Sequence, residues 1–201
     1  MSSTSLRRAD LDPDPLRQFA AWYTEAAAAV STPEAVVLAT ATPTGAPAAR
    51  MVLLKGFDQR GFVFYTNYFS RKGQEIAQNP RAAMLFHWSP LGRQVRIEGV
   101  VVRVDAAESD AYFKTRPTGS RMSAAASPQS RVVASRSVLE DAVRALGARY
   151  PEGKVPRPDE WGGLRLEASR YEFWQHGDDR LHDRFRYRRE NDAWVVERLG
   201  P

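Results

Sequence analysis

Two separate groups of side chains in this sequence carry the donors that bind a phosphate. In the first, Tyr65 and Thr66 closely precede Arg71 and Lys72, which follow Ser70 at the predicted start of a helix. Hydroxyl, guanidinium and ammonium groups beside the free N–H groups of a helix N-terminus suit a phosphate. An ordinary capped helix with solvated cations explains the same residues, and this segment alone slightly favours that simpler interpretation.

The second group contains Tyr112, Arg116 and Ser120. Tyr112 and Arg116 are four residues apart, so they share a face of any helix that reaches this far. Ser120 follows a proline and a glycine and is expected in a turn. Two separate donor groups predict two anionic groups in the ligands of this protein.

A third cluster lies near the C-terminus, where Arg180, His182 and Arg184 alternate after Trp174. In an extended chain these three side chains point to the same side, and such a group needs an anion to offset its repulsion. A metal site is a poorer interpretation, because the three histidines of the chain lack paired ligand spacing.

Two strand segments carry weaker signals. Arg50 and Lys55 are an odd number of positions apart, so in one strand they face opposite sides. From this segment alone, solvent-facing strand ends explain both residues as well as a ligand site does. Gln94, beside Arg96, has an amide that can donate to and accept from the edge of a ring, although a surface glutamine in a strand is common.

Short strands joined by turns must position these groups. A helix is expected from Asp14, as the N-cap, and Pro15, another from Ser70 to before Pro80, and a third over Ala106–Thr115. The capping-box spacing of Ser137 and Glu140 predicts a fourth helix that ends near Arg149. Strands are expected over Ala35–Thr42, Ala48–Phe57, Phe62–Asn67, Arg81–Trp88, Gln94–Val104, Leu164–Trp174, Arg184–Glu190 and Ala193–Leu199. Asn191-Asp192 is expected to form the hairpin turn between the last two.

About seven strands with few helices predict a mainly β, α+β fold: a closed or partly closed antiparallel barrel with peripheral helices. Residues 1–14 are expected to form a mobile N-terminal arm, and residues 15–201 a single domain. No Rossmann or P-loop glycine motif is present.

Composition narrows the function further. The 201 residues are 43% apolar, which is enough for a core, and the absence of cysteine excludes disulfides and thiolate catalysis. The formal charge of +5 is spread through strands and turns, which favours small phosphorylated ligands over nucleic acid. Neither a membrane span nor an export signal is apparent, so a cytoplasmic protein is expected.

Taken in order, these segments resemble the pyridoxamine 5'-phosphate oxidase family from roughly Leu6 to the C-terminus. The similar segments are Arg50–Lys55, Phe64–Asn67, Ser70–Gly73, Gln94–Gly99, Tyr112–Pro117, Ser127–Ser130, Glu172–Gln175, Arg180–Phe185 and Glu190–Leu199. The resemblance implies a split β-barrel that binds FMN between the subunits of a homodimer. It also implies oxidation of pyridoxamine or pyridoxine 5'-phosphate at C4', with hydride transfer to the flavin and reoxidation by O2 to give H2O2.

The same resemblance implies the roles of individual residues. The implied FMN contacts are Arg50, Met51, Val52, Leu53, Leu54, Lys55, Tyr65, Thr66, Arg71, Lys72, Gln94, Gln129, Ser130, Trp174 and Arg184. The implied substrate contacts are Lys55, Tyr112, Arg116, Ser120, Arg180, Leu181 and His182, of which Arg180 and His182 are the catalytic candidates. The sequence departs from the family in a short N-terminal arm, which puts closure over the site in doubt. It also departs in the less polar pair Thr118-Gly119, which is expected to alter the stiffness of the loop but not its donors.

Two other classes of protein remain open at this point. The first is another split-barrel reductase that uses a flavin or a deazaflavin, although the Tyr112–Ser120 and Arg180–His182 groups suit a phosphorylated pyridine better. The second is a non-enzymatic module that binds pyridoxal phosphate or nucleic acid. A steep salt dependence of binding would identify a nucleic-acid-binding module.

Overall fold

The computed structural model describes residues 5–201. Their strands are β1 (Ala35–Ala41), β2 (Pro47–Leu53), β3 (Gly56–Asp58), β4 (Gly61–Asn67), β5 (Arg81–Trp88), β6 (Arg93–Arg103), β7 (Trp161–Gln175), β8 (Asp183–Glu190) and β9 (Ala193–Leu199). The α-helices are α1 (Pro15–Ala29), α2 (Arg71–Gln78), α3 (Ala106–Thr115), α4 (Thr118–Ala126) and α5 (Arg136–Arg149). Three short 3-10 helices are η1 (Arg8–Asp10), η2 (Ser89–Leu91) and η3 (Asp178–Arg180). Within residues 5–201, no helix is long and apolar enough to cross a lipid bilayer.

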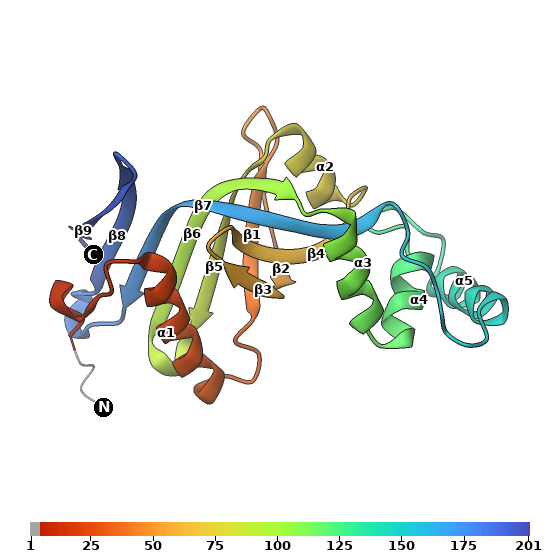
Figure 1. Cartoon of the computed structure of the whole chain (residues 1–201), viewed down its shortest axis with the longest axis horizontal. Helices are drawn as coiled ribbons and strands as arrows, with labels where there is room; N and C mark the ends of the chain where they lie inside the picture. The colour runs from red at the N-terminus through yellow and green to blue at the C-terminus, as the bar shows by residue number, and fades with distance from the viewer. Residues whose placement is uncertain (1–4) are drawn as a thin grey trace.

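The strands form one antiparallel sheet in the order β2-β1-β5-β6-β7-β4-β3, and the β8–β9 hairpin continues from β7. The two outer strands, β2 and β3, are joined by Leu54 and Lys55 only, so the sheet must curl until its edges meet (Figure 1). Helices lie outside the sheet, with α3, α4 and α5 together at one end. The predicted mainly β, α+β barrel with peripheral helices is confirmed.

Strand β7 is the longest element and spans the molecule (Figure 1). Its first half pairs with β4, where Leu164 lies opposite Phe64, and its last residues pair with β8, where Trp174 lies opposite Arg184. At about 3.3 Å per residue, its 15 residues extend for roughly 45 Å along the strand. Groups placed at its two ends therefore cannot meet within one chain.

Helix α1 supplies the core with aromatic side chains. Asp14 accepts a hydrogen bond from the Leu16 amide and so caps the helix, as predicted. Phe19 is fully buried, with its ring centroid 5.0 Å from that of Phe62 and 5.1 Å from that of Phe86. This packing holds α1 against the hydrophobic core of the sheet.

Two sequence predictions were wrong about element boundaries. The expected strand Ala48–Phe57 is divided, because the Leu54 amide bonds the Glu34 carbonyl whereas the Lys55 amide bonds that of Val63. The chain changes its pairing partner here, from the β1 side to the β4 side, so one expected strand becomes two, β2 and β3.

The helices at the far end also differ from expectation. Ser120 lies in helix α4 rather than in a turn. The predicted capping box is wrong too, because α5 begins at Arg136 and Ser137 lies inside it. The Arg136 guanidinium instead bonds Glu140, four residues on. The predicted hairpin turn is found at Asn191 and Asp192, which both adopt positive φ.

The N-terminal segment contacts the β8–β9 hairpin. The Ser5 hydroxyl and the Leu6 amide both donate to Asp183, at 3.0 and 2.9 Å, and the Leu6 side chain is buried. Arg8 donates to the Val196 carbonyl. The arm predicted over residues 1–14 lies partly outside the described residues, in residues 1–4, and its mobility stays a prediction.

Candidate functional site

One pocket, with a volume of about 480 Å³, brings together residues that the sequence analysis had taken from five separate segments. It lies where β2, β4, α2, α3 and α4 approach one another. Its lining contains eleven of the predicted site residues: Met51, Val52, Leu53, Lys55, Tyr65, Thr66, Lys72, Tyr112, Arg116, Ser120 and Gln129. The remaining lining residues are Thr115, Pro117 and Trp161, which were not predicted.

Stacked aromatic rings form one wall of this pocket. The rings of Tyr65 and Tyr112 stack with centroids 3.8 Å apart, and Trp161 lies 5.5 Å from Tyr65 in a nearly parallel plane. A Cβ at Gly163 would lie 2.9 Å from Tyr65 Cε1, so glycine leaves room for this ring. Burial raises the pKa of Tyr65 to about 12 and raises that of Tyr112 as well, so both hydroxyls stay protonated and can donate.

At one end of the pocket, three donors converge on a single neutral oxygen. Gln129 Oε1 accepts from the Thr66 hydroxyl at 3.2 Å, from the Asn67 amide at 3.3 Å and from Lys72 Nζ at 3.5 Å. Lys72 is buried, and this burial, together with nearby Arg50, lowers its pKa. A hydroxyl, a backbone amide and an ammonium aimed at one point are the donors that suit a phosphate oxygen, so this end of the pocket fits an anionic group.

A second anion-binding group lies farther along the same pocket. Arg116 Nη1 is buried and has no hydrogen-bond partner among the described residues. Its guanidinium lies 4.6 Å above the ring of Trp161. Because a buried guanidinium N–H without a partner is costly, this arrangement fits an anionic ligand. Lys55 and Ser120 line the same pocket and can serve the same anion.

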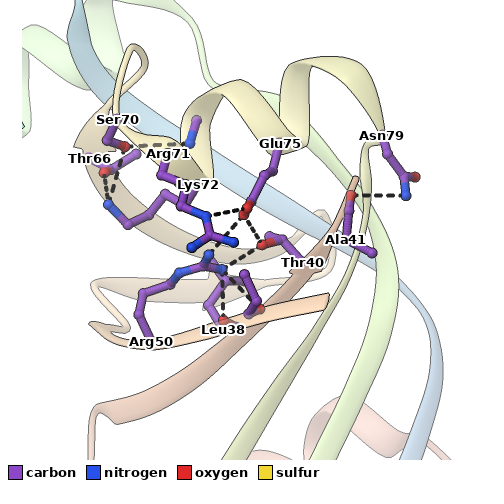
Figure 2. A network of polar contacts seen from close by, with 12 residues as sticks. Leu38, Thr40, Ala41, Arg50, Thr66, Ser70, Arg71, Lys72, Glu75 and Asn79 are labelled. Carbon is purple, nitrogen blue, oxygen red and sulfur yellow. Dashed lines mark hydrogen bonds and ion pairs between the residues drawn. The ribbon is translucent and has the colours of Figure 1, made fainter. Parts of the chain in front are cut away.

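Arg50 and Arg71, both predicted to contact a cofactor, do not line this pocket. They bond one buried carboxylate behind it, that of Glu75, which sequence reasoning missed (Figure 2). Arg50 also donates to the Thr40 hydroxyl at 2.6 Å and to the Leu38 carbonyl at 3.1 Å. The only sequence signal for Glu75 was its spacing of four residues from Arg71 on the same helix.

Two further predicted contacts lie outside the pocket lining. The Leu54 side chain belongs to the hydrophobic core, so only its backbone is available to a ligand. Ser130 is exposed, directly after Gln129, and adopts a positive φ of 70°.

The third predicted cluster lies at the opposite end of β7. Gln94 faces Trp174 across the β6–β7 ladder, and the His182 ring lies 4.6 Å from that of Trp174. Arg184 bonds Glu172 through Nε and Nη2. Leu181, which was implied as a substrate contact, is 72% exposed.

The expected alternation of Arg180, His182 and Arg184 is wrong at its first member. Arg180 ends the 3-10 helix η3 with a φ of 63°, so the chain is not extended there. His182 Nδ1 accepts from the Gly177 amide at 3.3 Å, which closes this turn. The structure therefore divides the predicted site into a pocket half at the start of β7 and a half around Trp174 at its end, which we call the β7–β8 half.

Comparison with known proteins identifies the family of this chain. The family model described as "Pyridoxamine 5'-phosphate oxidase" matches residues 23–150, and the one described as "Pyridoxine 5'-phosphate oxidase C-terminal dimerisation region" matches residues 161–201. A relative from Cyanothece sp., named pyridoxine/pyridoxamine 5'-phosphate oxidase, is 52% identical over 198 residues, which cover 98% of this chain and 93% of the relative. One of the same name from Rubrobacter xylanophilus is 56% identical, over 94% of this chain and 88% of the relative.

Solved structures agree with this assignment. PhzG from Burkholderia lata, solved with tetrahydrophenazine-1-carboxylic acid, has a TM-score of 0.93 at 33% identity, with 100% of both chains covered. A pyridoxamine 5'-phosphate oxidase-related FMN-binding protein from Nostoc punctiforme has the same fold, with a TM-score of 0.73 at 19% identity over 94% of this chain and 98% of its own. This chain belongs to the pyridoxamine 5'-phosphate oxidase family.

Proposed function

We propose that this protein is an FMN-dependent oxidase that converts pyridoxamine or pyridoxine 5'-phosphate to pyridoxal 5'-phosphate. The observation that carries the proposal is a pair of anion-binding groups in one pocket, at Lys72 with Gln129 and at Arg116. A phosphorylated flavin and a phosphorylated pyridine supply one anion each. The names of the relatives, which are more than 50% identical, support the same reaction.

The residues of the pocket half divide between the two ligands. Arg71 and Lys72, with Thr66, Gln129 and Ser130, would hold the FMN phosphate. Lys55, Tyr112, Arg116 and Ser120 would hold the substrate phosphate. When bound, FMN would accept a hydride from the substrate's C4' and pass the electrons to O2, which gives H2O2. With the amine substrate, a water molecule would then replace the amino group, which leaves as ammonia.

The protein's contribution to the reaction is to position its ligands. The two tyrosines of the pocket wall stay protonated, so they cannot repel the phosphates as phenolates. Arg180 and His182 would orient the substrate's pyridine ring, and the Gly177 amide that donates to His182 Nδ1 leaves Nε2 as the donor of the neutral ring.

A homodimer is part of the proposal, because the β7–β8 half cannot reach the pocket half of its own chain. Residues 161–201, which match a dimerisation region, contain all of β7, β8 and β9. We propose that a two-fold axis places the β7–β8 half of each chain over the pocket half of its partner, with FMN between them. Gln94, Trp174 and Arg184 would then contact FMN from the second chain.

A second candidate follows from the likeness to PhzG, whose ligand is a reduced tricyclic carboxylic acid. The substrate of this protein would then carry a carboxylate at Arg116 in place of a phosphate. The donors around Arg116, which include a lysine, a tyrosine and a serine, favour the phosphate because it offers more acceptor oxygens.

The test is the visible absorption spectrum of the purified protein, before and after anaerobic addition of pyridoxine 5'-phosphate. We expect an oxidised-flavin band that bleaches with substrate and returns in air. A band that bleaches only with tetrahydrophenazine-1-carboxylic acid would support the second candidate, and a band that ignores both compounds would indicate a reductase. Absence of a band after addition of FMN would contradict the cofactor assignment.

A further inference from the structure

Glu75 lies at the centre of a buried polar network that joins three elements (Figure 2). Its side chain is 7% exposed. Oε2 accepts from the Thr40 hydroxyl on β1 at 2.5 Å and from Arg50 Nη2 on β2 at 2.8 Å, and Oε1 accepts from Arg71 Nε on α2 at 2.8 Å. One carboxylate thus fixes two guanidinium groups that come from different parts of the fold.

This carboxylate is charged in the folded protein. Burial works to raise the pKa of Glu75, but hydrogen bonds from Thr40, Arg71 and Arg50 outweigh it and hold the pKa below its usual value. The charge of Glu75 also acts on Lys72, where it opposes the effects of burial and of Arg50 on the pKa. Glu75 is therefore a counter-charge to three cations at the start of α2.

We propose that Glu75 is a positioning residue for the phosphate of the flavin. It holds Arg50 and Arg71 in fixed positions behind the pocket end that Lys72 lines, so that their positive charges are in place before the phosphate arrives. The proposal rests on the proposed binding of FMN. It adds a residue that carries the same charge as the phosphate and therefore cannot itself bind it.

Removal of Glu75 has two opposite effects on phosphate binding. It adds a net positive charge, which attracts the phosphate, and it releases two guanidinium groups, which then repel each other and Lys72. The Arg71 side chain is already 67% exposed, so without Glu75 it is free to move into solvent, where water screens its charge. We therefore expect the release of the two guanidinium groups to outweigh the added positive charge, so that the Glu75 variant binds FMN more weakly.

The experiment compares FMN with riboflavin, which lacks the phosphate, on apoprotein by quenching of flavin fluorescence. We expect Glu75→Gln to raise the Kd of FMN about tenfold and to leave that of riboflavin nearly unchanged, so that the preference for FMN collapses. Glu75→Asp, which keeps the charge on a shorter side chain, is expected to recover part of the preference.

The matched control is Glu108→Gln. Glu108 also holds an arginine, because both of its oxygens accept from Arg165 Nη2 and so join α3 to β7, but neither residue lines the pocket. This variant should lose stability and keep the wild-type ratio of the two Kd values. If Glu75→Gln unfolds, Thr40→Val is the substitute, because it removes one hydrogen bond to the same carboxylate. This variant should also reduce the preference for FMN over riboflavin.

The outcomes separate this inference from the proposed function. Wild-type protein that binds neither flavin would overturn the proposed function. If the wild-type protein prefers FMN and Glu75→Gln keeps or increases this preference, the proposed role of Glu75 is wrong and the proposed function stands.

Discussion

The guanidinium of Arg116 lies 4.6 Å above the ring of Trp161, and one of its buried nitrogen atoms has no partner among the described residues. Burial also lowers the pKa of Arg116, which shows that its charge is poorly solvated. Trp161 thus supports one face of the guanidinium, whose donors remain available to a ligand in the pocket.

The first prediction concerns this arginine. Arg116→Ala should raise the KM for pyridoxine 5'-phosphate by at least about a hundredfold, because a charge-assisted hydrogen bond contributes about 1.5–3 kcal/mol and Arg116 can make two. The kcat should change little, since the phosphate is bound equally in the ground and transition states. Steady-state kinetics measures both constants, and an unchanged KM would exclude Arg116 from phosphate binding.

The second prediction concerns Arg180, at the opposite end of β7. Arg180→Ala should reduce turnover far more than it reduces retention of FMN, because we assign Arg180 to the substrate ring. Flavin content after gel filtration and single-turnover bleaching of the flavin band separate the two effects. Equal losses of turnover and of FMN would instead assign Arg180 to the cofactor.

The third prediction tests whether each site is built from two chains. Arg116→Ala impairs the pocket half and Arg180→Ala the β7–β8 half, so each variant alone should be nearly inactive at low substrate concentration. When the two variants are unfolded and refolded together, half of the dimers are mixed and each has one intact site, so activity should return to about a quarter of wild type. A mixture that stays as inactive as its components would show that both halves act within one chain.

The fourth prediction concerns pH and the N-terminal segment. Burial works to raise the pKa of Asp183, but hydrogen bonds from Arg198, Ser5 and Leu6 outweigh it, so the pKa is lowered. A lowered pKa gives stability that is present above the unfolded value of about 3.9 and is lost as pH falls through the folded value. The free energy of unfolding should therefore fall below about pH 4, and this fall should be smaller in Asp183→Asn.

The same variant offers a structural readout. Asp183→Asn weakens the attachment of Ser5 and Leu6, so trypsin should cleave after Arg7 and Arg8 faster than in the wild-type protein at neutral pH. Equal rates of cleavage would show that the other contacts of this segment, such as the bond of Arg8 to the Val196 carbonyl, hold it without Asp183.

Local signals in the sequence predicted most elements. The Asp14-Pro15 start of α1, the Ser70 cap of α2 and the turn at Asn191-Asp192 each depend on residues that are adjacent in the chain. The division of the strand before Lys55 could not be predicted, because it depends on which distant strand each amide finds. Helix α4 was missed because its glycine and serines, at Gly119, Ser120 and Ser123, read as a turn.

In the candidate site, too, local features could be predicted from the sequence and long-range contacts could not. Residue types identified the two anion-binding groups, and the structure brings Lys72, Gln129 and Arg116 into one pocket. Glu75 was missed because two of its partners, Thr40 and Arg50, are remote in the sequence, and Trp161 was missed because it acts through the remote Arg116. The prediction that Arg180, His182 and Arg184 point to the same side was also wrong at Arg180. It assumed an extended chain, and the positive φ of Arg180 interrupts that conformation.

Strand β7 carries the pocket half at its start and the β7–β8 half at its end, and this arrangement has a genetic consequence in the proposed dimer. Every chain then contributes to both sites of its dimer, one through each end of the strand. A chain damaged at one end spoils one site of a mixed dimer, whereas a chain damaged at both ends spoils both. Doubly damaged copies would therefore act as dominant inhibitors of intact ones, and a single newly made chain would stay inactive until it met a second.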